Sequence, residues 1–180
     1  LYHDIAIFFD RKLTVTTAIH TCDKLCKYPL SFLLVPSPQV GFLFLICCRF
    51  FLCKVDLLQI DLFTGQSALY KFGAAPTYVR KGDTVSKLSG SALPAGLVDG
   101  DGVSPDVTRL DLEAGDTVVL VSDGALTDGT EWLMQQLQLC ARLGHTPAQA
   151  AQTVADAAAR RAGEKQDDIT VAIFALGKAG

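Results

Sequence analysis

The sequence predicts an α+β fold, in which several antiparallel strands precede two helices and one more strand closes the chain. Three observations predict this order. Short runs rich in β-branched and aliphatic residues alternate with turn signals over residues 55–121. Two longer segments between residues 130 and 161 have helical spacing or capping signals, and an apolar run returns at 169–176.

The predicted strands before the helices are separated by turns that contain glycine or proline. Thr64 and Gly65 form the turn of a hairpin, whereas the glycine- and proline-rich stretch 89–106 is a long loop. The last of these strands, TVVLV, is fully apolar, as is typical of a buried central strand. The predicted strands cover residues 55–62, 67–72, 77–80, 85–88, 107–112 and 117–121.

Two helices are predicted to follow. In residues 130–143 apolar residues recur at spacings of three and four, and Gly144 is a natural C-terminal stop. Thr146 and Gln149 form a capping box, with proline at the first helical position between them. The second helix should therefore begin there and run to about Arg161.

The composition changes sharply near residue 54. Five of the six cysteines and seven of the ten phenylalanines lie in residues 1–54. Those residues carry six Lys/Arg and three Asp/Glu, whereas residues 55–180 carry ten and sixteen. We therefore place a domain boundary at residues 54–55.

The bulk properties exclude several classes of partner. A formal net charge of -3 and a pI near 5.5 argue against nucleic acid, whose binding proteins usually present a basic face. The apolar run 40–48 is shorter than the roughly 20 residues that cross a bilayer, so it predicts a buried strand or helix. The cysteines lack zinc-finger spacing. A first residue of Leu1 and no secretory signal predict a cytoplasmic fragment of a longer protein.

Acidic residues stand at the ends of two predicted buried strands. Asp123 and Gly124 follow the strand 117–121, and Asp167 and Asp168 precede the closing strand. Carboxylates that converge at strand ends repel one another unless a cation neutralises them, and oxygen ligands favour Mg²⁺ or Mn²⁺. From spacing alone, a metal site and solvated turn residues remain alternatives.

The same segments carry a resemblance to a known family. VSDG at 121–124 and DDIT at 167–170, two helices apart, resemble the last two metal motifs of 2C-type metal-dependent protein phosphatases. LQIDLFTGQSALYKFGAAPTYVRKGD at 58–83 and LPAGLVD at 93–99 resemble the middle of stage II sporulation protein E phosphatase domains. Residues 55–180 are thereby identified as similar to the C-terminal part of such a domain.

The resemblance implies a layered α-β-β-α sandwich with a two-ion Mn²⁺ or Mg²⁺ centre. It implies that Asp123 is a metal ligand and that Asp167 is a ligand to the second ion. Asp168 would support the site without direct ligation, and Gly124 would let the backbone approach it. No catalytic side chain is implied, because a metal-activated water performs the attack.

The implied reaction is hydrolysis of a phosphoserine or phosphothreonine phosphoprotein. By resemblance, the substrate is a phosphorylated anti-anti-sigma factor in bacterial sporulation control. The implied location is the cytoplasm. In a longer protein it would be the cytoplasmic face of the membrane, reached only through a preceding membrane region.

Residues 1–54 do not resemble the family, so the phosphatase domain is predicted to be incomplete on its N-terminal side. No Asp-Gly pair occurs before Asp99-Gly100, although the family has one in the first half of the domain. Three explanations compete: a frame or gene-end artefact, a degenerate replacement, or unrecognised residues that complete the site. Whether the chain is an enzyme stays open, with an inactive phosphatase-like binding or regulatory module as the alternative.

Overall fold

A computed structural model describes the protein as two compact units. The first unit comprises Leu1–Cys26, Pro76–Leu88 and Ala114–Gly180, and the second comprises Lys27–Ala75 and Ser89–Glu113. The residues described are 5–9, 13–20, 34–36, 40–49, 52–61, 64, 66–95, 97, 104–126, 128–163 and 167–177.

The first unit contains an antiparallel sheet in the order β1-β2-β11-β10-β7-β8. All five residues of β10 are buried, as are the first six of β11, because these two strands occupy the centre of the sheet. Strand order therefore explains the continuously apolar sequences TVVLV and ITVAIF. The strands are β1 (Ile5–Phe9), β2 (Leu13–His20), β7 (Thr77–Lys81), β8 (Thr84–Leu88), β10 (Thr117–Val121) and β11 (Ile169–Leu176).

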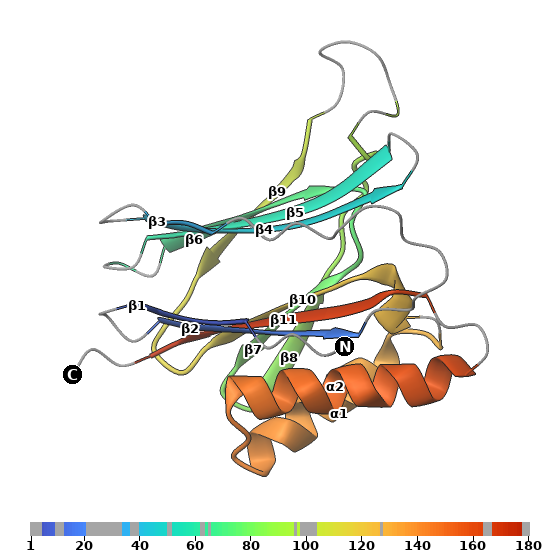
Figure 1. Ribbon diagram of the computed structural model, residues 1–180. Helices are drawn as coiled ribbons and strands as arrows, with labels where there is room; N and C mark the ends of the chain where they lie inside the picture. The colour runs from blue at the N-terminus through green and yellow to red at the C-terminus, as the bar shows by residue number, and fades with distance from the viewer. Residues whose placement is uncertain are drawn as a thin grey trace. The chain divides into compact units, whose positions relative to one another are not determined.

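Two helices, α1 (Glu131–Arg142) and α2 (Pro147–Ala162), lie on one face of this sheet (Figure 1). The buried side of α2 consists almost entirely of alanine, which lets the helix approach the strands closely. The predicted capping box is confirmed. The Thr146 hydroxyl accepts a hydrogen bond from the Gln149 amide at 3.3 Å, and Gln149 Oε1 accepts one from the Thr146 amide at 2.9 Å.

The second unit contains the antiparallel sheet β3-β4-β5-β6-β9. Burial along β6 follows the period of two expected for a strand with one covered face. Leu58 and Leu69 are cross-strand partners on that face, and both are fully buried. The strands are β3 (Leu34–Pro36), β4 (Val40–Arg49), β5 (Leu52–Asp61), β6 (Gln66–Phe72) and β9 (Asp106–Asp111).

The predicted elements of residues 55–180 are confirmed, with small shifts at their ends. The apolar run 40–48 is a strand, so of the two forms predicted for it the strand is correct. β5 begins at Leu52, before the composition break at residue 54. Residues before the break also pair within both sheets, β2 with β11 and β4 with β5. The origin of residues 1–54 and the boundary stay predictions.

Among the described residues, no helix has the length and apolarity to cross a membrane.

Candidate metal centre

Asp123 and Asp167 lie at the same end of two adjacent strands. β10 and β11 are antiparallel, with Val121 opposite Val171. Asp123 opens a short 3-10 helix, η1 (Asp123–Leu126), just after β10, and Asp167 lies just before β11. Because the end of one antiparallel strand lies beside the start of its neighbour, the two acidic segments of backbone meet there.

Gly124 brings these two segments into direct contact. A Cβ atom on Gly124 would lie 2.9 Å from the carbonyl carbon of Asp168 and 3.1 Å from that of Asp167. It would lie closer still to the carbonyl oxygen of Asp168. Only glycine lets the chain pass this close to the backbone of residues 167 and 168.

The carboxyl groups of this end are accessible. Asp123 and Asp167 are exposed and Asp168 is half-buried. Asp167 Oδ1 accepts a hydrogen bond from the Asp168 amide at 2.9 Å, which orients the Asp167 carboxylate. Accessible carboxylate oxygens fit the ligand chemistry of Mg²⁺ or Mn²⁺. Over the ranges that the structure describes, no group of three or more His, Cys, Asp or Glu could hold a metal ion. The acidic side chains that the described residues place at this end of the two strands are those of Asp123, Asp167 and Asp168.

A second set of contacts joins the segment that follows η1 to α2. The Arg161 guanidinium of α2 lies 2.7 Å from Asp128 Oδ2 and 5.0 Å from the centroid of the Trp132 ring on α1. The ion pair is exposed and such pairs contribute little, whereas Trp132 itself is buried. Sequence reasoning missed η1 and this cluster, because no local pattern links residues so far apart along the chain.

The second unit contains a charge cluster, of which Asp56 and Lys71 are buried, that sequence reasoning also missed. Asp56, Lys71 and Asp106 are register partners across β5, β6 and β9. Lys71 Nζ lies 2.6 Å from Asp56 Oδ1 and donates to the carbonyl oxygen of Ala75 at 2.6 Å. Burial lowers the pKa of Lys71, and the nearby Asp56 and Asp106 carboxylates oppose that shift. One sequence signal could have found the buried position of Asp56. In a strand, positions 56, 58 and 60 share one face, so Asp56 lies on the same buried face as Leu58 and Ile60.

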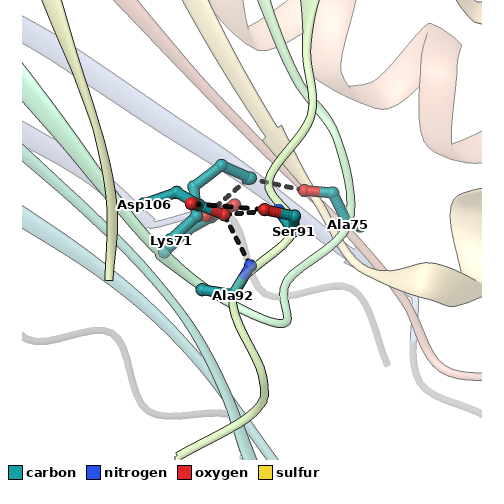
Figure 2. Close-up of polar contacts among 6 residues, drawn as sticks. Lys71, Ala75, Ser91, Ala92 and Asp106 are labelled. Atoms are coloured by element: carbon teal, nitrogen blue, oxygen red, sulfur yellow. Dashed lines mark hydrogen bonds and ion pairs between the residues drawn. The ribbon is translucent and has the colours of Figure 1, made fainter. Parts of the chain in front are cut away.

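Asp106 ties the loop after β8 to this cluster. Figure 2 shows Asp106 against the backbone of Ser91 and Ala92, with Lys71 and Ala75 beside them. The carboxylate accepts hydrogen bonds from both amides, at 2.6 Å from Ala92. These bonds hold the pKa of Asp106 below its usual value, and the bond from the Ala92 amide has the largest effect. The cluster contains none of the predicted metal ligands, and we assign it a structural role.

Comparison with known proteins shows the family. The family model of Stage II sporulation protein E (SpoIIE) matches residues 44–176. This match covers most of the chain and begins before the predicted boundary at residues 54–55. The chain belongs to the SpoIIE family. SpoIIE of Priestia megaterium is 27% identical over 127 residues, covering 68% of this chain and 21% of the relative. SpoIIE of Bacillus subtilis (strain 168) is 28% identical over 130 residues, covering 68% of this chain and 15% of the relative. The chain thus spans about a fifth or less of these curated relatives.

Solved structures show the fold. The PP2C phosphatase domain with a fragment of the regulatory domain of SpoIIE from Bacillus subtilis matches with a TM-score of 0.74 and 18% identity. That match covers 93% of this chain and 63% of the solved chain. The catalytic domain of the serine threonine protein phosphatase PstP, in complex with two manganese ions, matches with a TM-score of 0.60 and 14% identity. That match covers 93% of this chain and 100% of the solved PstP chain. The predicted α+β sandwich of 2C-type phosphatases is confirmed.

The comparisons confirm the resemblance of this SpoIIE-family chain to 2C-type serine/threonine phosphatase domains. The two manganese ions are a property of the solved PstP structure. The individual roles of Asp123, Gly124, Asp167 and Asp168 stay predictions.

Proposed function

We propose that this chain acts in the metal-dependent hydrolysis of phosphoserine or phosphothreonine in a protein substrate, with Asp123 and Asp167 holding a divalent cation. One observation carries the proposal. The backbone of Gly124 touches that of residues 167–168, so two accessible carboxylates share one end of the central strands. Membership of the SpoIIE family supports the choice of reaction.

The residues of this end would bind and orient, and none of them would attack the phosphorus. When bound, a pair of Mn²⁺ or Mg²⁺ ions supplies a water of lowered pKa and neutralises charge that develops on the phosphoryl group. Asp168 supports Asp167 through its amide, which donates to Asp167 Oδ1. Gly124 allows η1 to lie against the segment before β11.

By its likeness to the SpoIIE relatives, we propose that the substrate is a phosphorylated anti-anti-sigma factor of bacterial sporulation. The reaction would then take place in the cytoplasm, or at the cytoplasmic face of the membrane in a longer protein.

A second candidate function is a non-catalytic phosphatase-like module that binds a protein partner. The observation that favours it is the lack of any Asp-Gly pair before Asp99-Gly100, where the resemblance implies a further ligand. The placement of carboxylates, and not their number, sets the geometry of a metal site. We therefore expect this chain to hydrolyse a phosphoserine peptide more slowly than a phosphatase domain that has the further ligand.

Calorimetric titration with MnCl₂ tests the cation site. Asp123→Asn and Asp167→Asn should each raise the Kd for Mn²⁺ by about 100-fold or more, because each removes a charged ligand. Asp83→Asn is the matched control, since Asp83 is an exposed acid in the turn between β7 and β8. Unchanged Mn²⁺ affinity in both ligand variants would refute the assignment of these two residues.

Two further outcomes separate the candidate functions. No Mn²⁺ binding by the unsubstituted chain would favour the binding module. Rapid hydrolysis of a phosphoserine peptide with Mn²⁺, abolished by Asp123→Asn, would show an active enzyme and contradict the slow rate expected here.

A further inference from the structure

Ser122 connects the two acidic segments through its side chain. It lies between β10 and η1 and is 7% exposed. Its hydroxyl donates a hydrogen bond to the carbonyl oxygen of Asp168 at 2.9 Å and accepts one from the amide of Thr170 at 2.8 Å. Its own amide donates to the carbonyl oxygen of Thr170 at 3.0 Å. One residue thus makes three hydrogen bonds to the start of β11.

These bonds act on the backbone that carries the proposed ligands. Asp123 is the next residue after Ser122, and Asp167 immediately precedes the residue whose carbonyl Ser122 binds. Gly124 packs against the same stretch, so the segments are held at two neighbouring points. A hydroxyl is required at position 122, because one group must donate to a carbonyl and accept from an amide together. An alanine would leave both backbone groups without this partner in a buried place.

We propose that Ser122 is a positioning residue, whose hydroxyl fixes the segment with Asp123 against the segment with Asp167 and thereby sets the affinity for a divalent cation. The cation part of this inference rests on the proposed function. We do not assign Ser122 as a cation ligand, because its hydroxyl is bonded to the backbone of Asp168 and Thr170. It acts through the backbone of the two aspartates, as the groups that orient metal ligands commonly do.

The neighbouring Thr170 offers a matched control. Its side chain is fully buried, and its hydroxyl finds no hydrogen-bond partner in the part of the chain that the structure describes. Thr170→Val therefore removes a buried hydroxyl beside the site while keeping the amide that binds Ser122. Ser122→Thr keeps the hydroxyl at the bridging position and is the conservative variant.

The test is calorimetric titration of the full chain and its variants with MnCl₂, together with amide hydrogen exchange of the metal-free proteins. Ser122→Ala should raise the Kd for Mn²⁺ by about 10- to 100-fold. Thr170→Val should leave it unchanged, and Ser122→Thr should restore most of the affinity. The Thr170 amide should exchange about tenfold faster in Ser122→Ala than in the unsubstituted chain, because it loses its acceptor.

The outcomes separate this inference from the proposed function. If Ser122→Ala unfolds more easily but binds Mn²⁺ like the unsubstituted chain, Ser122 has a structural role only and the inference is overturned. If the unsubstituted chain binds no Mn²⁺, the cation part fails with the proposed function, and exchange at Thr170 decides whether Ser122 holds the segments. Equal exchange rates in Ser122→Ala and the unsubstituted chain would overturn that part as well.

Discussion

Replacing Gly124 by alanine should perturb the contact between η1 and the segment before β11. The added methyl carbon would lie 2.9 Å from the carbonyl carbon of Asp168, roughly 0.6 Å inside the ~3.5 Å at which carbon atoms pack favourably. The opposing atoms belong to the backbone, so no flexible side chain can turn away. The segment with Asp123 must therefore move away from the segment with Asp167.

The expected cost of this overlap is about 1–3 kcal/mol in the free energy of unfolding, the usual range for overpacking a buried contact. Urea unfolding, followed by the fluorescence of the single tryptophan, Trp132, measures it. Since the aspartates move apart, the affinity for Mn²⁺ should fall as well, by at least about tenfold.

Gly144→Ala separates the two effects. Gly144 lies in the loop between α1 and α2 with a φ of 67°, and an added Cβ there would meet nothing within 4 Å. Backbone strain at that position should cost about 1–2 kcal/mol and leave Mn²⁺ affinity unchanged. The reasoning is refuted if Gly124→Ala unfolds at the same urea concentration as the unsubstituted chain and binds Mn²⁺ equally well.

Three further changes test other parts of the fold. Burial raises the pKa of Tyr78 to about 12, above its ordinary value of 10.0, so its contribution to stability is complete below about pH 10 and lost as the pH rises through 12. Tyr78→Phe should remove this loss from alkaline unfolding curves. The pKa of Asp106 is lowered, so its contribution is present above the ordinary value of 3.8 and lost as the pH falls through the lowered one. Asp106→Asn should therefore reduce the fall in the free energy of unfolding at acid pH, measured by urea unfolding at a series of pH values. Thr146→Ala breaks the capping box and should lower the free energy of unfolding by about 1 kcal/mol, measured in urea.

Much of the fold could be predicted because its signals are local. The strand 117–121 and the strand 169–176 have the predicted bounds, since each is a short apolar run of mainly β-branched or aliphatic residues. The start of α2 was set by its capping box, which depends on residues only three positions apart.

The pairing of the strands could not be predicted in this way. That β10 and β11 are neighbours, with both helices between them in sequence, depends on packing of the whole unit. Spacing alone therefore leaves the proximity of Asp123 and Asp167 open as one of two alternatives, and the family resemblance favours it. The hydrogen bonds of Ser122 depend on the same register, so no pattern in the sequence singles out that serine.

The contrast between two acidic residues, Asp56 and Asp167, argues for different roles. Asp56 is fully buried against the Lys71 ammonium, so Asp56→Asn should leave that charge poorly compensated and cost about 3–5 kcal/mol in unfolding free energy. Asp167 is exposed, and Asp167→Asn keeps an oxygen that can accept the Asp168 amide. Without metal its unfolding free energy should stay within about 0.5 kcal/mol of the unsubstituted chain. If Asp167→Asn were as destabilising as Asp56→Asn in metal-free urea unfolding, Asp167 would be a structural residue, and its assignment as a cation ligand would lose its basis.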